Sequence, residues 1–128
     1  MKKFEPIWYT IPLFQEEEPI QVYHKEQDEQ SEAKILEKKN SVKNLHVLAR
    51  ADFSYGGEER ALLRITADDQ YQLYVNGTFL GQGPAPAYPE HYYYNEFDLT
   101  GLLHPGNNVI AVHLYYQGLL NRVWNSGD

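Results

Sequence analysis

Apolar and polar residues alternate along several short segments in the second part of the chain. In residues 45–54 every second residue is apolar. Residues 61–66 alternate again, with Leu63 and Ile65 on one face. A period of two places neighbouring side chains on opposite faces of an extended chain. The pattern therefore predicts two β-strands, each with one face toward a core.

A third alternating run, from Tyr71 to Val75, ends at Asn76 and Gly77. A two-residue type I′ turn requires positive φ at both central residues, which Asn tolerates and Gly adopts without steric cost. The chain then returns through residues 78–80. This segment is the strongest hairpin signal in the sequence.

The chain between residues 81 and 116 continues with short segments separated by turn residues. Gly81–Pro89 contains three prolines and predicts a long irregular loop. The elements expected after it are a strand at 92–99, a short helical turn at 98–103, a turn at 104–108 and a strand at 109–116. Many short strands without alternating helices predict an all-β fold, an antiparallel jelly-roll β-sandwich.

The residues before Leu45 differ in composition from the alternating segments that follow. Residues 4–14 are rich in aromatic and aliphatic residues and contain two prolines, which predicts an extended edge piece packed on the body. Residues 15–40 are rich in Glu, Gln and Lys and read as a solvated loop or insertion, or, at Ser31–Lys39, as a capped short helix. We therefore expect an N-terminal extension over residues 1–44, packed on or inserted in the sandwich. The sandwich itself is expected over 45–128 and truncated at its C-terminal end.

Composition narrows the class of protein. The chain has 128 residues, a length that suits one domain, and 42% of them are hydrophobic, enough for one core. Its net charge of -7 argues against nucleic acid and acidic membranes as partners, because phosphate groups bind clustered Lys and Arg. The N-terminal residues contain no signal-peptide pattern, and no apolar run approaches the length of a membrane-spanning helix. We therefore expect a cytoplasmic protein.

A search for catalytic and metal-binding motifs gives no candidate. The sequence contains no Cys, no nucleophile elbow and no phosphate-binding glycine loop. Asp68 and Asp69 fit a turn better than a calcium site. The histidines show no metal-ligand spacing; they are His24, His46, His91, His104 and His113. We expect no catalytic residue, no metal and no cofactor in this chain.

Two aromatic and amide groups are the candidates for carbohydrate binding, because sugars stack on aromatic faces and bond to amides. The first group is His91, Tyr92, Tyr94 and Asn95. The second group is Asn121 and Trp124. In a strand, Tyr92 and Tyr94 share a face, so at least one side of this run packs in the sheet or core. Structural tyrosines and a core or interdomain tryptophan stay open as the alternative.

Four segments together resemble the N-terminal β-sandwich of bacterial α-L-rhamnosidases of the inverting, helical-barrel type. They are the run Asp68–Gly81, the pair Gly83-Pro84, the run Tyr93–Thr100 and the run Leu102–Val112. The resemblance covers roughly residues 45–128, and β-galactosidase-like enzymes share the hairpin. The resemblance implies a galactose-binding-like jelly roll. It also implies that the catalytic acid and base lie in a later helical barrel, and no residue of this chain matches those catalytic motifs.

Three functions follow as hypotheses. The first is a noncatalytic N-terminal accessory domain of an α-L-rhamnosidase-like glycoside hydrolase. Its implied partners are the catalytic helical-barrel domain of the same polypeptide and a rhamnose-containing saccharide. The second is a stand-alone carbohydrate-binding module, and the third is a protein-interaction β-sandwich. In each case the fragment itself is expected to be inactive as an enzyme.

Overall fold

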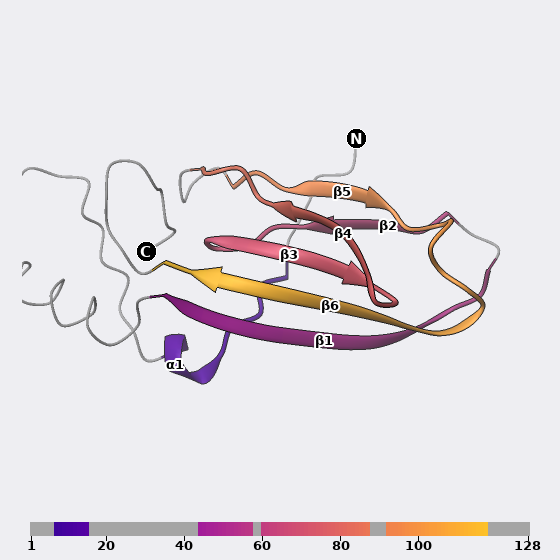
Figure 1. The fold of residues 1–128 in the computed structure, drawn as a ribbon, viewed down its shortest axis with the longest axis horizontal. Coiled ribbons are helices and arrows are strands. Elements are labelled where there is room, and N and C mark those ends of the chain that lie inside the picture. The colour runs from indigo at the N-terminus through magenta and orange to yellow at the C-terminus, as the bar shows by residue number, and fades with distance from the viewer. Residues whose placement is uncertain (1–6, 16–43, 58–59, 88–91, 118–128) are drawn as a thin grey trace, which may run out of the picture.

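The computed structural model describes residues 7–15, 44–57, 60–87 and 92–117. Apart from one short helix, the regular elements in this part of the chain are antiparallel β-strands (Figure 1). They are α1 (Pro12–Gln15), β1 (Leu45–Tyr55), β2 (Leu62–Ile65), β3 (Gln70–Val75), β4 (Thr78–Gly83), β5 (Asn95–Asp98) and β6 (Gly106–Tyr116). The expectation of an all-β antiparallel sandwich is confirmed. The predictions at residues 16–43, His91 and 118–128 lie outside the described residues.

Two sheets form the sandwich. The larger has four strands in the order β1-β6-β3-β4, and the smaller pairs β2 with β5. In the larger sheet, β1 pairs along its whole length with β6, from Leu45 opposite Tyr116 to Tyr55 opposite Gly106. The smaller sheet lies against the β3–β4 side of the larger one (Figure 1). Strands distant in sequence therefore become neighbours.

The core lies between the two sheets and centres on β3. Tyr71, Leu73 and Val75 are 1%, 0% and 1% exposed, as their shared face predicts. The partly buried side chains packed on this core are Leu63, Ile65, Leu80, Phe97, Ile110, Val112 and Leu114. Burial of such apolar area is the main term that stabilises a domain of this size. Each of the two sheets thus contributes one apolar face.

The predicted hairpin is present between β3 and β4. Asn76 has φ 47° and Gly77 has φ 81°, so both central residues adopt the positive φ that a type I′ turn requires. A register shift between Leu73 and Tyr74 adds a bulge to the pairing of β3 with β4. The turn therefore has the conformation that its local sequence predicts, and the bulge adjusts which residues of β3 and β4 face each other.

The predicted loop at Gly81–Pro89 is wrong at its start, because β4 continues to Gly83. Gly81 pairs with Leu73, and Gly83 pairs with Tyr71. A Cβ at Gly81 would lie 3.0 Å from the ring of Phe97, and one at Gly83 would collide with the side chain of Asn95. These glycines are strand residues that let β5 approach β4 closely.

Three other predicted elements differ in extent or type. The strand expected at 92–99 is regular only in β5, and the strand expected at 109–116 begins earlier, in β6. The short helical turn expected at 98–103 is confirmed, because Leu102 N and Leu103 N both donate to Leu99 O. The extended piece expected at 4–14 contains α1, because Pro12 suits the first turn of a helix.

Residues 7–15 contact the sandwich through two aromatic pairs. The rings of Trp8 and Tyr92 meet edge to face with centroids 5.2 Å apart. The rings of Phe14 and Tyr116 meet in the same way at 4.8 Å. Edge-to-face pairs add a favourable electrostatic term to the apolar area that they bury. The domain boundary at residue 44 stays a prediction.

Candidate functional site

The face of the larger sheet that points away from the smaller sheet carries the candidate site. Directly paired residues of antiparallel strands share a face, so strand register orders this face into rows. We call it the outer face. The first row is His46, Tyr115 and Gln70. The second is Leu48, His113, Gln72 and Gln82. The third is Arg50, Ala111, Tyr74 and Phe79.

The two histidines of the outer face touch each other. His46 Nδ1 lies 2.8 Å from His113 Nε2, so one ring donates a hydrogen bond to the other. The ring of Tyr115 lies 4.9 Å from that of His46, and its hydroxyl donates to Asn44 Oδ1 at 2.8 Å. The hydrogen bond and the ring contact hold the imidazoles in place. They join β1 to β6 on the solvent side of the sheet.

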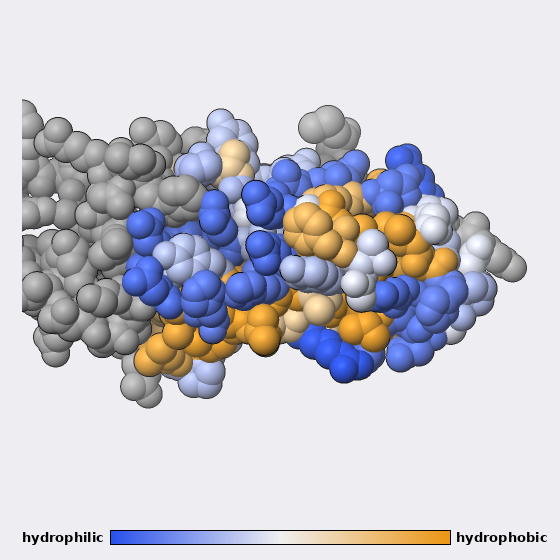
Figure 2. Space-filling view, in the orientation of Figure 1, coloured by the Kyte–Doolittle hydropathy of each residue, from blue (hydrophilic) through white to orange (hydrophobic). Residues whose placement is uncertain are grey.

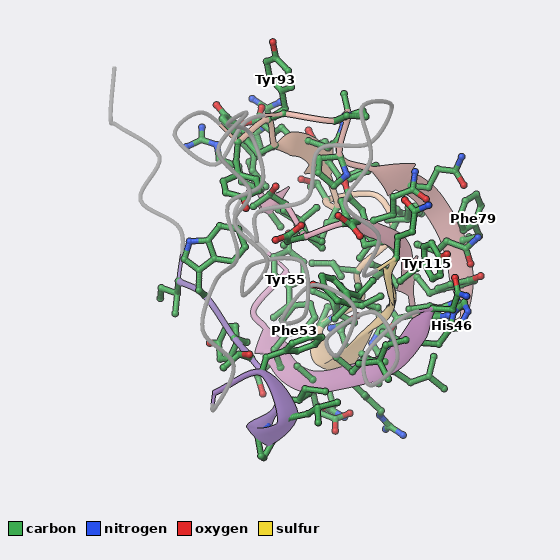
Figure 3. All side chains as sticks on the ribbon, turned by 90° about the vertical axis from the view of Figure 1, so that its left-hand side faces the viewer. His46, Phe53, Tyr55, Phe79, Tyr93 and Tyr115 are labelled. Atoms are coloured by element: carbon green, nitrogen blue, oxygen red, sulfur yellow. The ribbon has the colours of Figure 1, made fainter. Side chains whose placement is uncertain are left out.

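A shallow depression of about 400 Å³ lies over the first two rows. Its lining residues are His46, Gln70, Tyr71, Gln72, Gln82, His113 and Tyr115. We call it the outer-face groove. Figure 2 views this side of the molecule, where hydrophilic surface borders smaller apolar patches. In Figure 3, His46, Tyr115 and Phe79 project from one side of the larger sheet, and Phe53 and Tyr55 from the other.

An aromatic pair borders the groove in the third row. Tyr74 and Phe79 have ring centroids 5.4 Å apart, and Phe79 is 51% exposed. The Tyr74 hydroxyl donates to Gln72 Oε1 at 3.4 Å, which connects the aromatic row to the polar rows. An exposed Phe beside an amide-lined depression is the arrangement that sugar rings and other flat, partly apolar ligands use.

The residues predicted as a carbohydrate site do not line this groove. The Tyr92 hydroxyl donates to Asp68 Oδ2 at 3.3 Å, and its ring contacts Trp8. Asn95 faces inward, where its Oδ1 accepts a hydrogen bond of 2.7 Å from the Tyr71 hydroxyl. Tyr94 is 42% exposed. His91, Asn121 and Trp124 lie outside the described residues. Binding by this set stays a prediction.

The smaller sheet carries ion pairs on its exposed side. Arg60 Nε lies 3.0 Å from Asp98 Oδ2, and Arg64 Nε lies 2.7 Å from Glu96 Oε2. The Thr100 hydroxyl and backbone N–H, followed by Arg60, lower the pKa of Asp98 to about 2. The hydrogen bond to Glu96 raises the pKa of Arg64. The two ion pairs lie on the exposed side of the smaller sheet and help to hold β2 and β5 together.

The described residues contain neither a cluster of metal ligands nor a helix that could span a membrane. Within them, no group of three or more His, Asp or Glu side chains converges as metal ligands would. In the same part of the chain, no helix has the length and apolar character needed to cross a membrane. The His46–His113 pair therefore has no third ligand of these types among the described residues.

Sequence reasoning missed the outer-face groove. His46 and His113 are 67 positions apart, and neither the spacing of histidines nor any motif relates them. The only signal was indirect, because each is a polar residue at the outward position of an alternating strand. Without the pairing of β1 with β6, nothing brings the two residues together.

Comparison with known proteins finds similarity to solved structures alone. No family model and no curated protein matches the chain. Solved structures do match, and they include glycoside hydrolases of which the chain corresponds to a small part. By its similarity to the rhamnosidase among them, the chain is a β-sandwich domain related to part of a glycoside hydrolase.

Three solved glycoside hydrolases illustrate the extent of the similarity. The GH78 family rhamnosidase of Bacillus sp. GL1 is 36% identical, with a TM-score of 0.61, over 64% of this chain and 9% of the rhamnosidase. A β-glucuronidase of Bifidobacterium dentium is 25% identical over 55% of this chain and 11% of its own, with a TM-score of 0.46. A β-D-mannosidase from Dictyoglomus thermophilum is 24% identical over 55% and 9%, with a TM-score of 0.45.

Proposed function

We propose that this chain is a noncatalytic accessory domain of an α-L-rhamnosidase-like glycoside hydrolase. The observation that carries the proposal is its 36% identity to a GH78 family rhamnosidase, of which the matched region is only 9%. A segment that small corresponds to one module of a multidomain enzyme. The module supports the catalytic part and assists saccharide binding.

The chemistry of the described residues supports a noncatalytic role. Glycoside hydrolysis ordinarily uses two carboxyl groups that flank the scissile bond, one of them with a raised pKa. Asp98 has the opposite property, a pKa lowered to about 2, and Glu96 is held by Arg64. Asp98, with its lowered pKa, is unsuited to general acid catalysis, and both carboxylates form ion pairs in the smaller sheet.

The partner in this proposal is a catalytic helical-barrel domain of the same polypeptide. The contact between a β-sandwich and a catalytic domain of the same polypeptide is an inter-domain interface. Such interfaces are more polar than a protein core. The exposed large side chains of the smaller sheet and its flanking segments, such as Leu62 and Tyr93, are available for such packing. The substrate class in this proposal is a rhamnose-containing saccharide.

Turnover of 4-nitrophenyl α-L-rhamnopyranoside tests the proposal. The 128-residue chain is expected to release no nitrophenol, and the polypeptide encoded by the complete reading frame is expected to release it. Release by the chain alone would contradict the noncatalytic role. A reading frame that stops after Asp128 would contradict the accessory-domain role and favour a stand-alone binding or interaction module.

A further inference from the structure

We propose that the outer-face groove binds an uncharged saccharide, with His46, Gln72 and Gln82 as its hydrogen-bonding residues. The inference deepens the proposed function, and rests on it for the substrate class. It also separates the binding site from the tyrosine run that the sequence favoured. Four strands, β1, β6, β3 and β4, supply the groove.

The His46–His113 pair offers a ligand both a hydrogen-bond donor and a hydrogen-bond acceptor. A neutral imidazole has one donor nitrogen and one acceptor nitrogen. One nitrogen of each ring is used in the His46–His113 hydrogen bond. If His46 donates, its second nitrogen is an acceptor and that of His113 is a donor; the reverse direction exchanges the two. In either case one donor and one acceptor remain, which suits a hydroxyl because it also donates and accepts.

The amides continue this pattern across the sheet. Gln72 stands opposite His113 on β6 and opposite Gln82 on β4, so the three side chains form one cross-strand row. Each glutamine offers an acceptor oxygen and two N–H donors. The row therefore presents several donors and acceptors over three neighbouring strands, which suits the neighbouring hydroxyls of a sugar ring.

The absence of formal charge in the groove selects the ligand class. None of its lining residues is Lys, Arg, Asp or Glu. Arg50 and Asp52, which lie on the same face of the larger sheet, pair with each other at 3.1 Å. An anionic ligand would gain no ion pair there and would be repelled by a net charge of -7. A neutral saccharide pays no such cost.

The aromatic row extends the surface beyond one sugar ring. Rows two residues apart are separated by about 7 Å along a strand, so the rows of Tyr115 and Phe79 lie about 13 Å apart. Phe79 is half exposed at the far end of this span. An oligosaccharide that places hydroxyls on the first two rows reaches this ring with its next sugar.

Titration of the isotope-labelled 128-residue chain, followed by amide chemical shifts, tests the inference. The probes are L-rhamnose, cellotetraose and β-1,4-galactotetraose, with tetragalacturonate as the charged comparison. At least one neutral probe is expected to shift the amides of His46, Gln72 and Gln82, and tetragalacturonate is expected to shift none of them. His46→Ala and Gln82→Ala are each expected to weaken binding about tenfold, the value of one net hydrogen bond.

Controls on another surface make the result specific. Tyr93 is 62% exposed, and Figure 3 shows it far from His46 and Tyr115. Tyr93→Ala is therefore expected to bind as the parent does. Loss of binding in Tyr94→Ala with full binding in Gln82→Ala would overturn the inference in favour of the tyrosine run. Absence of shifts with all neutral probes would also overturn it, and would leave the accessory-domain proposal to its own turnover test.

Discussion

Asn76 and Asn108 join two turns that are 32 positions apart in sequence. Asn76 Nδ2 donates to Asn108 Oδ1 at 2.8 Å, and Asn76 Oδ1 accepts from Val109 N at 2.9 Å. Asn108 is fully buried, and its Nδ2 donates to His104 O at 2.7 Å and to Gly106 O at 3.0 Å. The hairpin turn of β3 and β4 is thereby tied to the start of β6.

Asn108→Ala is expected to lower the free energy of unfolding by about 2 to 3 kcal/mol, because it removes every hydrogen bond of a buried side chain, namely those to the His104 and Gly106 carbonyl groups, to His104 N and to Asn76 Nδ2. Asn107→Ala is the matched control, since Asn107 is exposed. It is expected to change stability by less than about 0.5 kcal/mol. Urea unfolding followed by circular dichroism measures both, and equal losses would contradict a special role for Asn108.

Gly83→Ala is expected to destabilise the fold by about 1 to 3 kcal/mol, the usual cost of overpacking. The added Cβ would meet Asn95 Oδ1 and lie 3.1 Å from the Tyr71 hydroxyl. Gly101→Ala is the control, because a Cβ there meets nothing within 4 Å. Thermal melts of the two variants compare the sites. Gly83→Ala as stable as Gly101→Ala would show that β5 does not require the close approach.

Tyr71 makes stability depend on pH in the alkaline range. Burial raises the pKa of Tyr71 from 10.0 to about 12. The raised value means that the folded state favours the protonated phenol. This contribution is therefore fully present below pH 10 and is lost as the pH rises through about 12.

Tyr71→Phe tests this pH dependence. The variant is expected to lose about 1 kcal/mol at neutral pH, the value of the hydrogen bond to Asn95. Its stability should then fall less steeply than that of the parent protein between pH 10 and 12. Urea unfolding at several pH values, with absorbance titration of the tyrosines, measures both effects. Parallel stability curves for the two proteins would contradict the burial of the Tyr71 hydroxyl.

Asp98 contributes in the opposite direction, at acid pH. Its pKa is lowered from 3.8 to about 2, first by Thr100 and then by Arg60. A lowered pKa gives stability that is present above about pH 4 and is lost as the pH falls through about 2. Thr100→Val is expected to raise the pKa of Asp98 more than Arg60→Gln does, measured by carboxyl carbon NMR. The reverse order would contradict the leading role of Thr100.

Local sequence was sufficient for much of the fold. The alternating run at Tyr71–Val75 predicted the buried face of β3, and Asn76 with Gly77 predicted the turn that follows. Both features depend on backbone preference and side-chain period, which act over a few residues. The sequence pattern predicted a loop at Gly81 and Gly83, but both are strand residues. A glycine is needed at each position because a side chain there would meet Phe97 or Asn95 of another strand.

The candidate site was not predictable in the same way. The tyrosine run is a candidate because aromatic residues cluster there in sequence, whereas the structure directs Asn95 inward to Tyr71. The residues of the outer-face groove are dispersed, and each has an ordinary polar character by itself. Only register makes a row of His113, Gln72 and Gln82.

The sequence by itself determined that the chain is rich in β-strands, the I′ turn, the buried face of β3 and the unfavourable charge for anionic partners, because these follow from local geometry and composition. The tertiary structure decided which strands pair, and so brought His46 to His113 and Asn76 to Asn108. The physical reason is that pairing of distant strands is set by how the whole chain buries its apolar faces. No local sequence pattern specifies which distant strands pair.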